Sequence, residues 1–161
     1  MKAKDLMVPA QDVLRPDDTL LRAVTLLRTV REGEECVGIK GLAVLDETGK
    51  LIGILSVGDF IKTAFPFYMG MMDLGEFSWD GMVETLARKA GDKLVKDIMS
   101  SVVITVEENS PLMEVIDHMI KHKVKRLPVL SKEGKVVGML YERDVFFAVT
   151  KAMLKEEGGA I

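Results

Sequence analysis

The stretch from Asp46 to Ile61 reads DETGKLIGILSVGDFI and decides the fold, because it occurs twice in the chain. The second copy, from Ser131 to Phe146, reads SKEGKVVGMLYERDVF. The residues shared by the two copies are Gly49, Lys50, Gly53, Leu55 and Asp59 in the first, and Gly134, Lys135, Gly138, Leu140 and Asp144 in the second. Internal repetition of this kind indicates a chain built from two copies of one structural unit.

Each copy predicts a β-hairpin followed by a helix. Two apolar runs, at 42–45 and 51–55, flank a polar turn that ends in Gly-Lys, and the runs at 127–130 and 136–140 do the same in the second copy. This pattern is typical of a hairpin. After the first hairpin, Ser56 and Asp59 have the spacing of an N-cap residue and the third residue of a helix, which predicts a capping box.

The repeat extends upstream of the hairpin, since KDLM at 4–7 matches KDIM at 96–99. The offset between matched residues falls along the chain: 92 for Met7 and Met99, 91 for Val24 and Val115, and 85 for Asp59 and Asp144. The first copy therefore carries six extra residues, which we place in or near 31–38.

The pattern divides the chain into a first repeat at 1–65, a connecting segment at 66–94, a second repeat at 95–157 and a frayed tail at 158–161. The connecting segment is rich in methionine and aromatic residues, and a helix is expected at 82–90 with Val83, Leu86 and Ala90 on one face. A short helical turn is expected at 3–8 and a turn at 95–99, further helices at about 19–31, 57–65, 111–122 and 142–156, and short strands at 13–14 and 103–106.

Composition excludes several classes of protein. The 161 residues carry 22 Lys and Arg against 25 Asp and Glu, without a basic stripe, which argues against nucleic-acid binding. A single cysteine, Cys36, rules out a disulfide framework within one chain. No apolar segment has the length of a signal peptide or of a membrane span, so we expect a soluble cytoplasmic protein.

The whole constellation resembles the cystathionine-β-synthase (CBS) domain. The shared elements are an Asp-apolar-Met motif, a short strand, a helix opened by Ser or Thr, Leu-Pro-Val-Leu, Gly-Lys-Val-Val-Gly and a final Asp. Two copies in tandem resemble a CBS pair, or Bateman module, and the resemblance covers 4–65 and 96–150. It implies an α/β fold of two β-α-β-β-α repeats packed about a pseudo-twofold axis, with two clefts between them.

The resemblance also implies a ligand, an adenosine-containing molecule such as AMP, ADP, ATP or S-adenosylmethionine, which the chain would sense without catalysis. In the first cleft Asp59 would bind the ribose and Ser56 would lie near the phosphate. The start of the second repeat would complete this cleft: backbone groups of Val103 and Ile104 would read the adenine, and the Thr105 hydroxyl would add a polar contact.

The second cleft departs from the family pattern. Asp144 is the equivalent aspartate, but Tyr141 replaces the small hydroxyl residue and could fill the space or stack on a base. At the helix start Glu142 would repel a phosphate, while Arg143 could attract one. We therefore expect unequal clefts, with the one at Ser56 and Asp59 the better. Lys125 and Arg126, in the basic cluster 121–126, are the candidate neighbours of a phosphate.

Simpler interpretations exist for each of these residues. Ser56 and Asp59 could serve only as a helix cap, and Thr105 could be an ordinary β-branched strand residue. The basic cluster could be a solvated helix end. His118 and His122 lack a third ligand for a metal, and Met69, Met71 and Met72 suit apolar filler better than a copper site. We expect no metal and no obligatory cofactor.

An alternative function is a dimeric interaction module whose clefts are empty or filled by its own side chains. The last helix would supply the contact through Val145, Phe146, Ala148, Val149, Ala152 and Met153. A homodimer, and an unidentified regulated protein as partner, are expected in either case. No phosphate-binding loop, nucleophile elbow or zinc-protease motif occurs, so we expect no enzyme.

Overall fold

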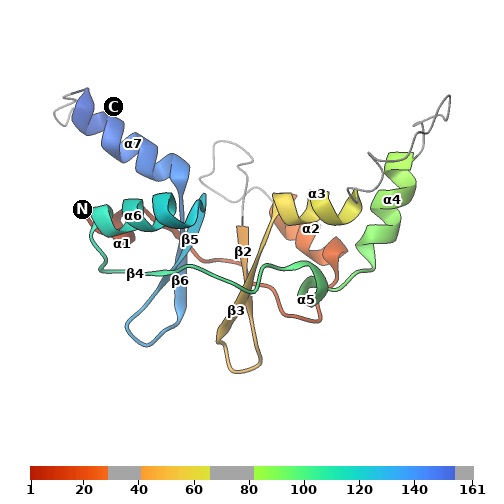
Figure 1. The fold of residues 1–161 in the computed structure, drawn as a ribbon. Coiled ribbons are helices and arrows are strands. Elements are labelled where there is room, and N and C mark those ends of the chain that lie inside the picture. The colour runs from red at the N-terminus through yellow and green to blue at the C-terminus, as the bar shows by residue number, and fades with distance from the viewer. Residues whose placement is uncertain (29–40, 66–81, 155–161) are drawn as a thin grey trace. The chain divides into compact units, whose positions relative to one another are not determined.

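The computed structural model describes residues 1–28, 41–65 and 82–154, and the chain forms two compact units. Unit 1 consists of Met1–Gln11 and Val103–Ile161, and unit 2 of Asp12–Val102. The units do not follow the repeat boundaries, because the first eleven residues belong with the second repeat. Each unit combines a hairpin with helices (Figure 1), which confirms the expected α/β fold.

Unit 2 is built around the antiparallel hairpin of β2 (Gly41–Leu45) and β3 (Leu51–Ser56). Its helices are α2 (Leu20–Arg28), α3 (Val57–Ala64), α4 (Met82–Gly91) and the short α5 (Val95–Ile98). Leu14 forms a parallel bridge with Val44 and so adds a third chain segment beside the hairpin. The core gathers the buried side chains of Leu14, Leu20, Ala23, Leu27, Leu42, Val44, Leu55, Ala64, Ala90 and Val95.

Unit 1 has a four-stranded sheet in the order β1-β6-β5-β4. The strands are β1 (Val8–Pro9), β4 (Val106–Glu107), β5 (Arg126–Leu130) and β6 (Val136–Tyr141), and the helices are α1 (Ala3–Leu6), α6 (Leu112–His122) and α7 (Glu142–Met153). The core gathers Ala3, Val106, Val115, Met119, Leu127, Val129, Leu140 and Val145.

In each hairpin turn, one side chain accepts hydrogen bonds from two backbone N–H groups. Asp46 Oδ1 accepts from the N–H of Thr48 and of Lys50, both at 2.9 Å, and Gly49 has the positive φ of 82° that the turn requires. The Thr48 hydroxyl and the Lys50 N–H lower the pKa of the Asp46 carboxyl. Ser131 takes the place of Asp46 in the second hairpin, where Gly134 has φ 77°.

The segments that lead into the two repeats pack on the opposite hairpins. β1 pairs antiparallel with β6, so that Val8 lies opposite Met139. In unit 2, Ser100 and Ile54 exchange two backbone hydrogen bonds, each of 3.0 Å. Each repeat as defined by sequence is thus completed by the segment that precedes the other one.

A methionine and a glycine make each of these contacts close. A Cβ added to Gly138 would lie 2.6 Å from Met7 Sδ and 2.9 Å from the carbonyl oxygen of Val8. In unit 2, a Cβ on Gly53 would overlap Met99 Sδ in the same way. The Asp-apolar-Met motif and the hairpin glycine therefore both occur twice in the sequence because each methionine packs on one of the two glycines.

Most expected elements are confirmed, with shorter ends. The strand expected at 103–106 is limited to β4, Leu14 forms a single bridge, and the last helix ends at Met153. In α4, Met82 and Leu86 are half-buried and Ala90 is buried, whereas Val83 is exposed, so the expected face was wrong by one residue. The insertion near 31–38, Cys36, the methionines at 69–72 and the tail lie outside the described residues.

The match between the two copies also needs a correction. Buried residues that occupy equivalent places in α2 and α6 are Ala23 and Val115, and Leu27 and Met119. The offset therefore stays at 92 through these helices, and it falls to 85 at Val44 and Val129, a difference of seven. The pairing of Val24 with Val115 is wrong by one residue, and the first copy has seven extra residues instead of six.

No helix among the described residues is long and apolar enough to cross a membrane.

The contact at Gly138 predicts that one added methyl group lowers the stability of the protein. Gly138→Ala should lower the free energy of unfolding in urea by about 1–3 kcal/mol, because a side chain and a backbone carbonyl must both move. Gly58→Ala is the control, since its Cβ would lie 3.6 Å from the nearest atom and helix propensity favours alanine. Equal stabilities of the two variants would contradict the packing described here.

Candidate functional site

The first candidate site lies at the start of α3, where Ser56 and Asp59 cap the helix. The backbone N–H of Ser56 donates to Asp59 Oδ2 at 2.8 Å, and the Ser56 hydroxyl donates to the same oxygen at 2.9 Å. The N–H of Asp59 in turn reaches Ser56 Oγ at 3.4 Å. The predicted capping box is confirmed.

The cap occupies only one of the two carboxylate oxygens of Asp59. Among the residues that the structure describes, Oδ1 has one long contact, from the Ser100 hydroxyl at 3.5 Å. A carboxylate oxygen accepts more than one hydrogen bond, so Oδ1 keeps capacity for the donors of a ligand. Ser100 was not predicted, although a comparison of the copies offered a signal: it follows Met99, whereas the equivalent position after Met7 is Val8.

The second candidate site, at the start of α7, is built differently. Tyr141 is the N-cap residue of α7, and its side chain makes no capping hydrogen bond. Asp144 Oδ2 is buried and accepts no hydrogen bond from the part of the chain that the structure describes. Its Oδ1 lies 3.7 Å from Arg143 Nε. A buried carboxylate oxygen without a donor is costly, so this position is poised to accept a donor from outside the chain.

Two basic residues accompany Asp144. The carbonyl oxygen of Lys125 accepts from the N–H of Glu142 at 2.9 Å, which fixes the chain before β5 beside the start of α7. Arg126 is the register partner of Tyr141, and its Nε is buried without an acceptor among the described residues. The equivalent position in unit 2 is Gly41, the partner of Ser56. At this register position the α7 site therefore has a cationic side chain where the described part of unit 2 has a glycine.

Thr105 lies in unit 1, beside the first turn of α6. It lines an open pocket of about 560 Å³ together with Val106, Glu107, Asn109, Ser110, Pro111, Glu114 and Leu130. Val103, Ile104 and Thr105 are half-buried and precede β4. Unit 1 thus brings together Lys125, Tyr141 and Asp144, and unit 2 brings together Ser56 and Asp59.

The two histidines of α6 pack against each other. Their ring centroids lie 5.8 Å apart in an edge-to-face arrangement. His118 Nδ1 is buried and has no hydrogen-bond partner in the described ranges. Within those ranges no three His, Cys, Asp or Glu side chains gather in a way that would hold a metal ion.

The contrast between the two aspartates predicts opposite effects on stability in the ligand-free protein. Asp59→Ala should lower the free energy of unfolding by about 1–2 kcal/mol, because Ser56 loses both of its hydrogen bonds to Oδ2. Asp144→Ala should change the same quantity by less than about 0.5 kcal/mol or raise it, because the exposed contact with Arg143 contributes little and a buried acceptor without a donor is removed. Urea denaturation of both variants tests this. A larger loss for Asp144→Ala would contradict the assignment.

Both repeats of the chain match a known protein family. The CBS domain family model matches residues 3–65 and 95–151. CBSX1, a chloroplastic CBS domain-containing protein of Arabidopsis thaliana, is 30% identical over 140 residues, which are 83% of this chain and 56% of that protein. The chain therefore spans a little over half of CBSX1.

Two solved structures share the fold. CBSX2 in complex with AMP has a TM-score of 0.64 and 24% identity, covering 94% of this chain and 98% of that one. The cytosolic domain of the Mg²⁺ channel MgtE in complex with ATP has a TM-score of 0.63 and 25% identity, covering 91% of this chain and 48% of that one. With the family model matched over both repeats, the chain belongs to the CBS domain family and carries the domain as a tandem pair.

Proposed function

We propose that this chain is a regulatory module, acting in the cytoplasm, that senses an adenosine-containing ligand in the cleft between its two repeats. The ligand would be AMP, ADP, ATP or S-adenosylmethionine, and its binding would change the packing of the domains or of a dimer. One observation carries the proposal: each unit places a carboxylate with unused acceptor capacity at the third position of the helix after its hairpin, through Asp59 Oδ1 and Asp144 Oδ2.

The chemistry of these positions suits a nucleoside. The two hydroxyls of a ribose are donors, and a carboxylate is the acceptor that binds them most strongly. The N-terminus of a helix attracts phosphate, and Ser56 and Gly58 are small enough to let it approach α3. Lys125 would add a positive charge. Val103, Ile104 and Thr105 would complete the site at Asp59, and Tyr141 would lie beside the ligand at Asp144.

The relatives support the same class of ligand. CBSX2 has been solved with AMP and MgtE with ATP, and CBS-pair proteins are generally regulatory modules. S-adenosylmethionine rests on the family resemblance alone. Among these ligands the α3 site suits a phosphorylated one, since Val57 and Gly58 leave the first turn small and uncharged, whereas the first turn of α7 has Glu142 followed by Arg143.

Connectivity offers a route by which a ligand could act. The chain passes from unit 1 to unit 2 between Gln11 and Asp12, and back between Val102 and Val103. The second crossing lies directly before Val103, Ile104 and Thr105, which are proposed to contact ligand. A ligand that binds one arrangement of the units more tightly than another would shift the population toward that arrangement.

A second candidate function is a dimeric interaction module whose clefts are empty or filled by its own side chains. The exposed apolar side chains of α7, among them Phe146 and Phe147, favour it. The two functions differ in one respect that is simple to measure, which is the binding of adenosine ligands.

Isothermal titration with AMP tests the proposed site. Asp59→Asn should weaken AMP binding about 10- to 100-fold, because one or two charge-assisted hydrogen bonds to ribose lose their charge. Asp92→Asn changes an exposed carboxylate of the same unit and should leave the affinity unchanged. Circular dichroism checks that both variants are folded.

Two results would count against the site or the function. Wild-type affinity in Asp59→Asn would remove Asp59 from the site. If AMP, ADP, ATP and S-adenosylmethionine all fail to bind the wild-type protein at millimolar concentration, the sensor function is wrong and the interaction module remains.

A further inference from the structure

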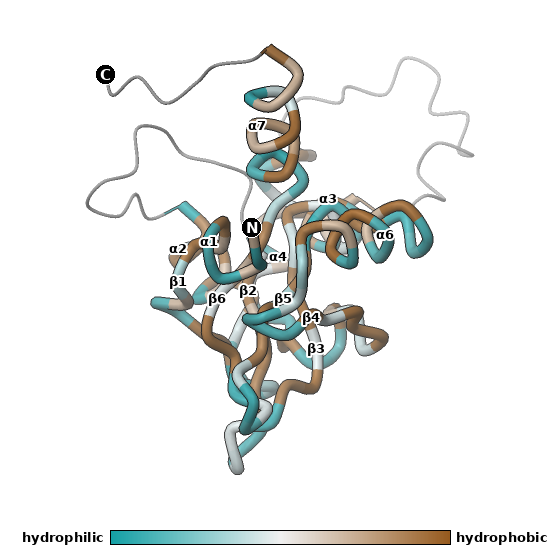
Figure 2. Tube along the Cα trace, turned by 90° about the vertical axis from the view of Figure 1, so that its left-hand side faces the viewer, coloured by the Kyte–Doolittle hydropathy of each residue, from teal (hydrophilic) through white to brown (hydrophobic). Residues whose placement is uncertain are grey.

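Two methionines, Met7 and Met99, lie directly against the backbone of a glycine. The position that a Cβ of Gly138 would take is 2.6 Å from Met7 Sδ, and Met99 Sδ takes up the same position at Gly53. In unit 1 the contact lies where β1 runs antiparallel to β6 (Figure 2). Each sulfur atom therefore fills a space that only a glycine leaves open.

A carbonyl oxygen borders each of these spaces. The oxygen of Val8 lies 2.9 Å from the Cβ position of Gly138, and the oxygen of Ser100 lies 3.2 Å from that of Gly53. A thioether accepts hydrogen bonds only weakly and packs as an apolar group, so it can lie beside these oxygens. A sulfoxide oxygen would add a strong acceptor beside another acceptor.

Two backbone donors that follow or face Met99 are already used. The N–H of Ser100 donates to the oxygen of Ile54, and the N–H of Ile54 donates to the oxygen of Ser100, both at 3.0 Å. This bridge therefore offers no free donor to a sulfoxide at Met99. Because a polar group in a closed contact is costly without a partner, the segment should open toward water when Met99 is oxidised.

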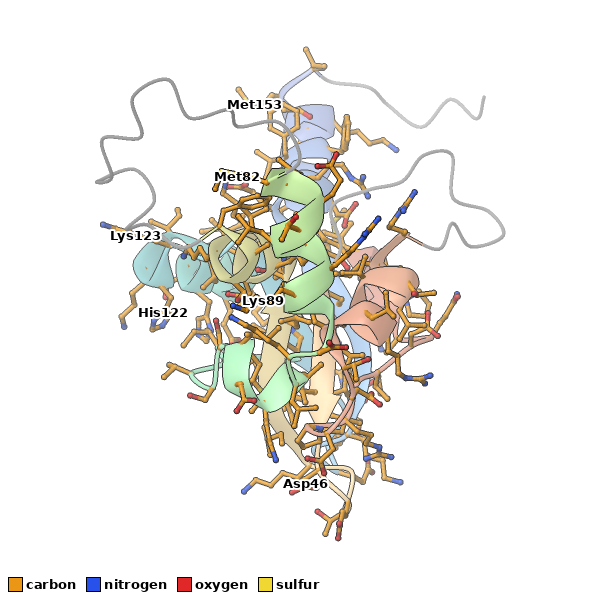
Figure 3. The ribbon with its side chains drawn as sticks, turned by 90° about the vertical axis from the view of Figure 1, so that its right-hand side faces the viewer. Asp46, Met82, Lys89, His122, Lys123 and Met153 are labelled. Carbon is orange, nitrogen blue, oxygen red and sulfur yellow. The ribbon has the colours of Figure 1, made fainter. Side chains whose placement is uncertain are left out.

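Both methionines are within reach of a small oxidant. Met7 and Met99 are half-buried in the folded chain. Met113 and Met153 are 74% and 73% exposed, and Met153 lies at the end of α7 (Figure 3). Oxidation of these two exposed side chains removes little packing, whereas Met7 and Met99 combine access with a contact that oxidation would break.

We propose that Met7 and Met99 are sites of reversible oxidation, and that their sulfoxides release the leading segments from the opposite hairpins. A peroxide transfers one oxygen atom to the sulfur, whose lone pair forms the S–O bond while the O–O bond breaks and water leaves. The sulfur loses two electrons and the peroxide gains them. A methionine sulfoxide reductase reverses the step, as two thiols become a disulfide and the oxygen leaves as water.

In unit 2 the release would extend to the candidate site at α3. The residue after Met99 is Ser100, whose hydroxyl lies 3.5 Å from Asp59 Oδ1. Oxidation of Met99 would therefore remove this contact and weaken AMP binding. That consequence rests on the proposed function, whereas the release of the segments does not.

Hydrogen exchange of the full chain, before and after treatment with hydrogen peroxide, tests the proposal. Mass spectrometry of the same peptides identifies the oxidised methionines. Peptides that cover 7–10, 52–56 and 98–101 should exchange about 10-fold faster after oxidation, because a buried polar group without a partner favours local opening. Methionine sulfoxide reductase with a dithiol should restore the slow exchange.

Two double variants assign the effect to these methionines. Met7→Leu with Met99→Leu keeps an apolar contact but cannot form a sulfoxide, so peroxide should leave its exchange unchanged. Met113→Leu with Met153→Leu is the matched control at exposed positions and should respond to peroxide like the wild-type chain. Circular dichroism checks that both variants are folded.

A single substitution tests the contact without an oxidant. Met99→Gln places a polar side chain of similar length at Gly53. It should speed exchange at 52–56 and 98–101 and leave 7–10 unchanged, whereas Met113→Gln should change none of these peptides.

The proposal is overturned if Met7 and Met99 stay reduced while Met113 and Met153 are oxidised, or if their oxidation leaves exchange unchanged. It is equally overturned if the leucine variant at 7 and 99 responds to peroxide like the wild-type chain, or if the reductase restores nothing. AMP titration of the reduced and oxidised protein keeps the two proposals apart. Reduced protein that binds no AMP would contradict the sensor function, while the exchange data would still decide on the oxidation.

Discussion

The structure depends on the contact between a methionine of each leading segment and a glycine of the opposite hairpin. Met7 lies on Gly138, and Met99 lies on Gly53. These contacts bind each repeat to the segment before the other, so neither repeat is complete alone. As a consequence the chain crosses between the units twice, and the second crossing lies directly before 103–105, the segment proposed to contact ligand. The folding of the two units and the proposed response to ligand therefore depend on the same short segments.

The two helix starts have an aspartate at the same position, but only one of the two caps its helix. Asp59 satisfies its own helix through Ser56 and keeps one oxygen for other donors. Asp144 has no serine to pair with, and its buried oxygen has no donor among the described residues. The α3 cap is therefore formed without a ligand, whereas the α7 site would gain its missing hydrogen bond from the proposed ligand.

Much of this architecture could be predicted from the sequence, because its signals are local. The hairpins follow from Gly49 and Gly134, and the cap of α3 follows from Ser56 and Asp59. The exchange of leading segments could not be predicted, since Val8 and Pro9 are too few to show a strand period and their partners lie about 130 residues away. Ser100 was missed although the difference between the copies after Met99 and Met7 offered a signal, because only the folded chain shows that it reaches Asp59. The face of α4 was wrong because Met82 and Val83 fit the same helical spacing, and only tertiary packing chooses between them.

Hydrogen–deuterium exchange of the full chain, with and without saturating AMP, tests the central claim most directly. If the ligand binds the helix start of the first repeat and the segment before β4 in the second, AMP should slow exchange in peptides that cover 54–59 and 103–105. The hairpin turns at 46–50 and 131–135 should exchange at the same rate with and without AMP and so serve as internal references. AMP binding that leaves 54–59 and 103–105 unchanged, or that protects only other segments, would contradict the account.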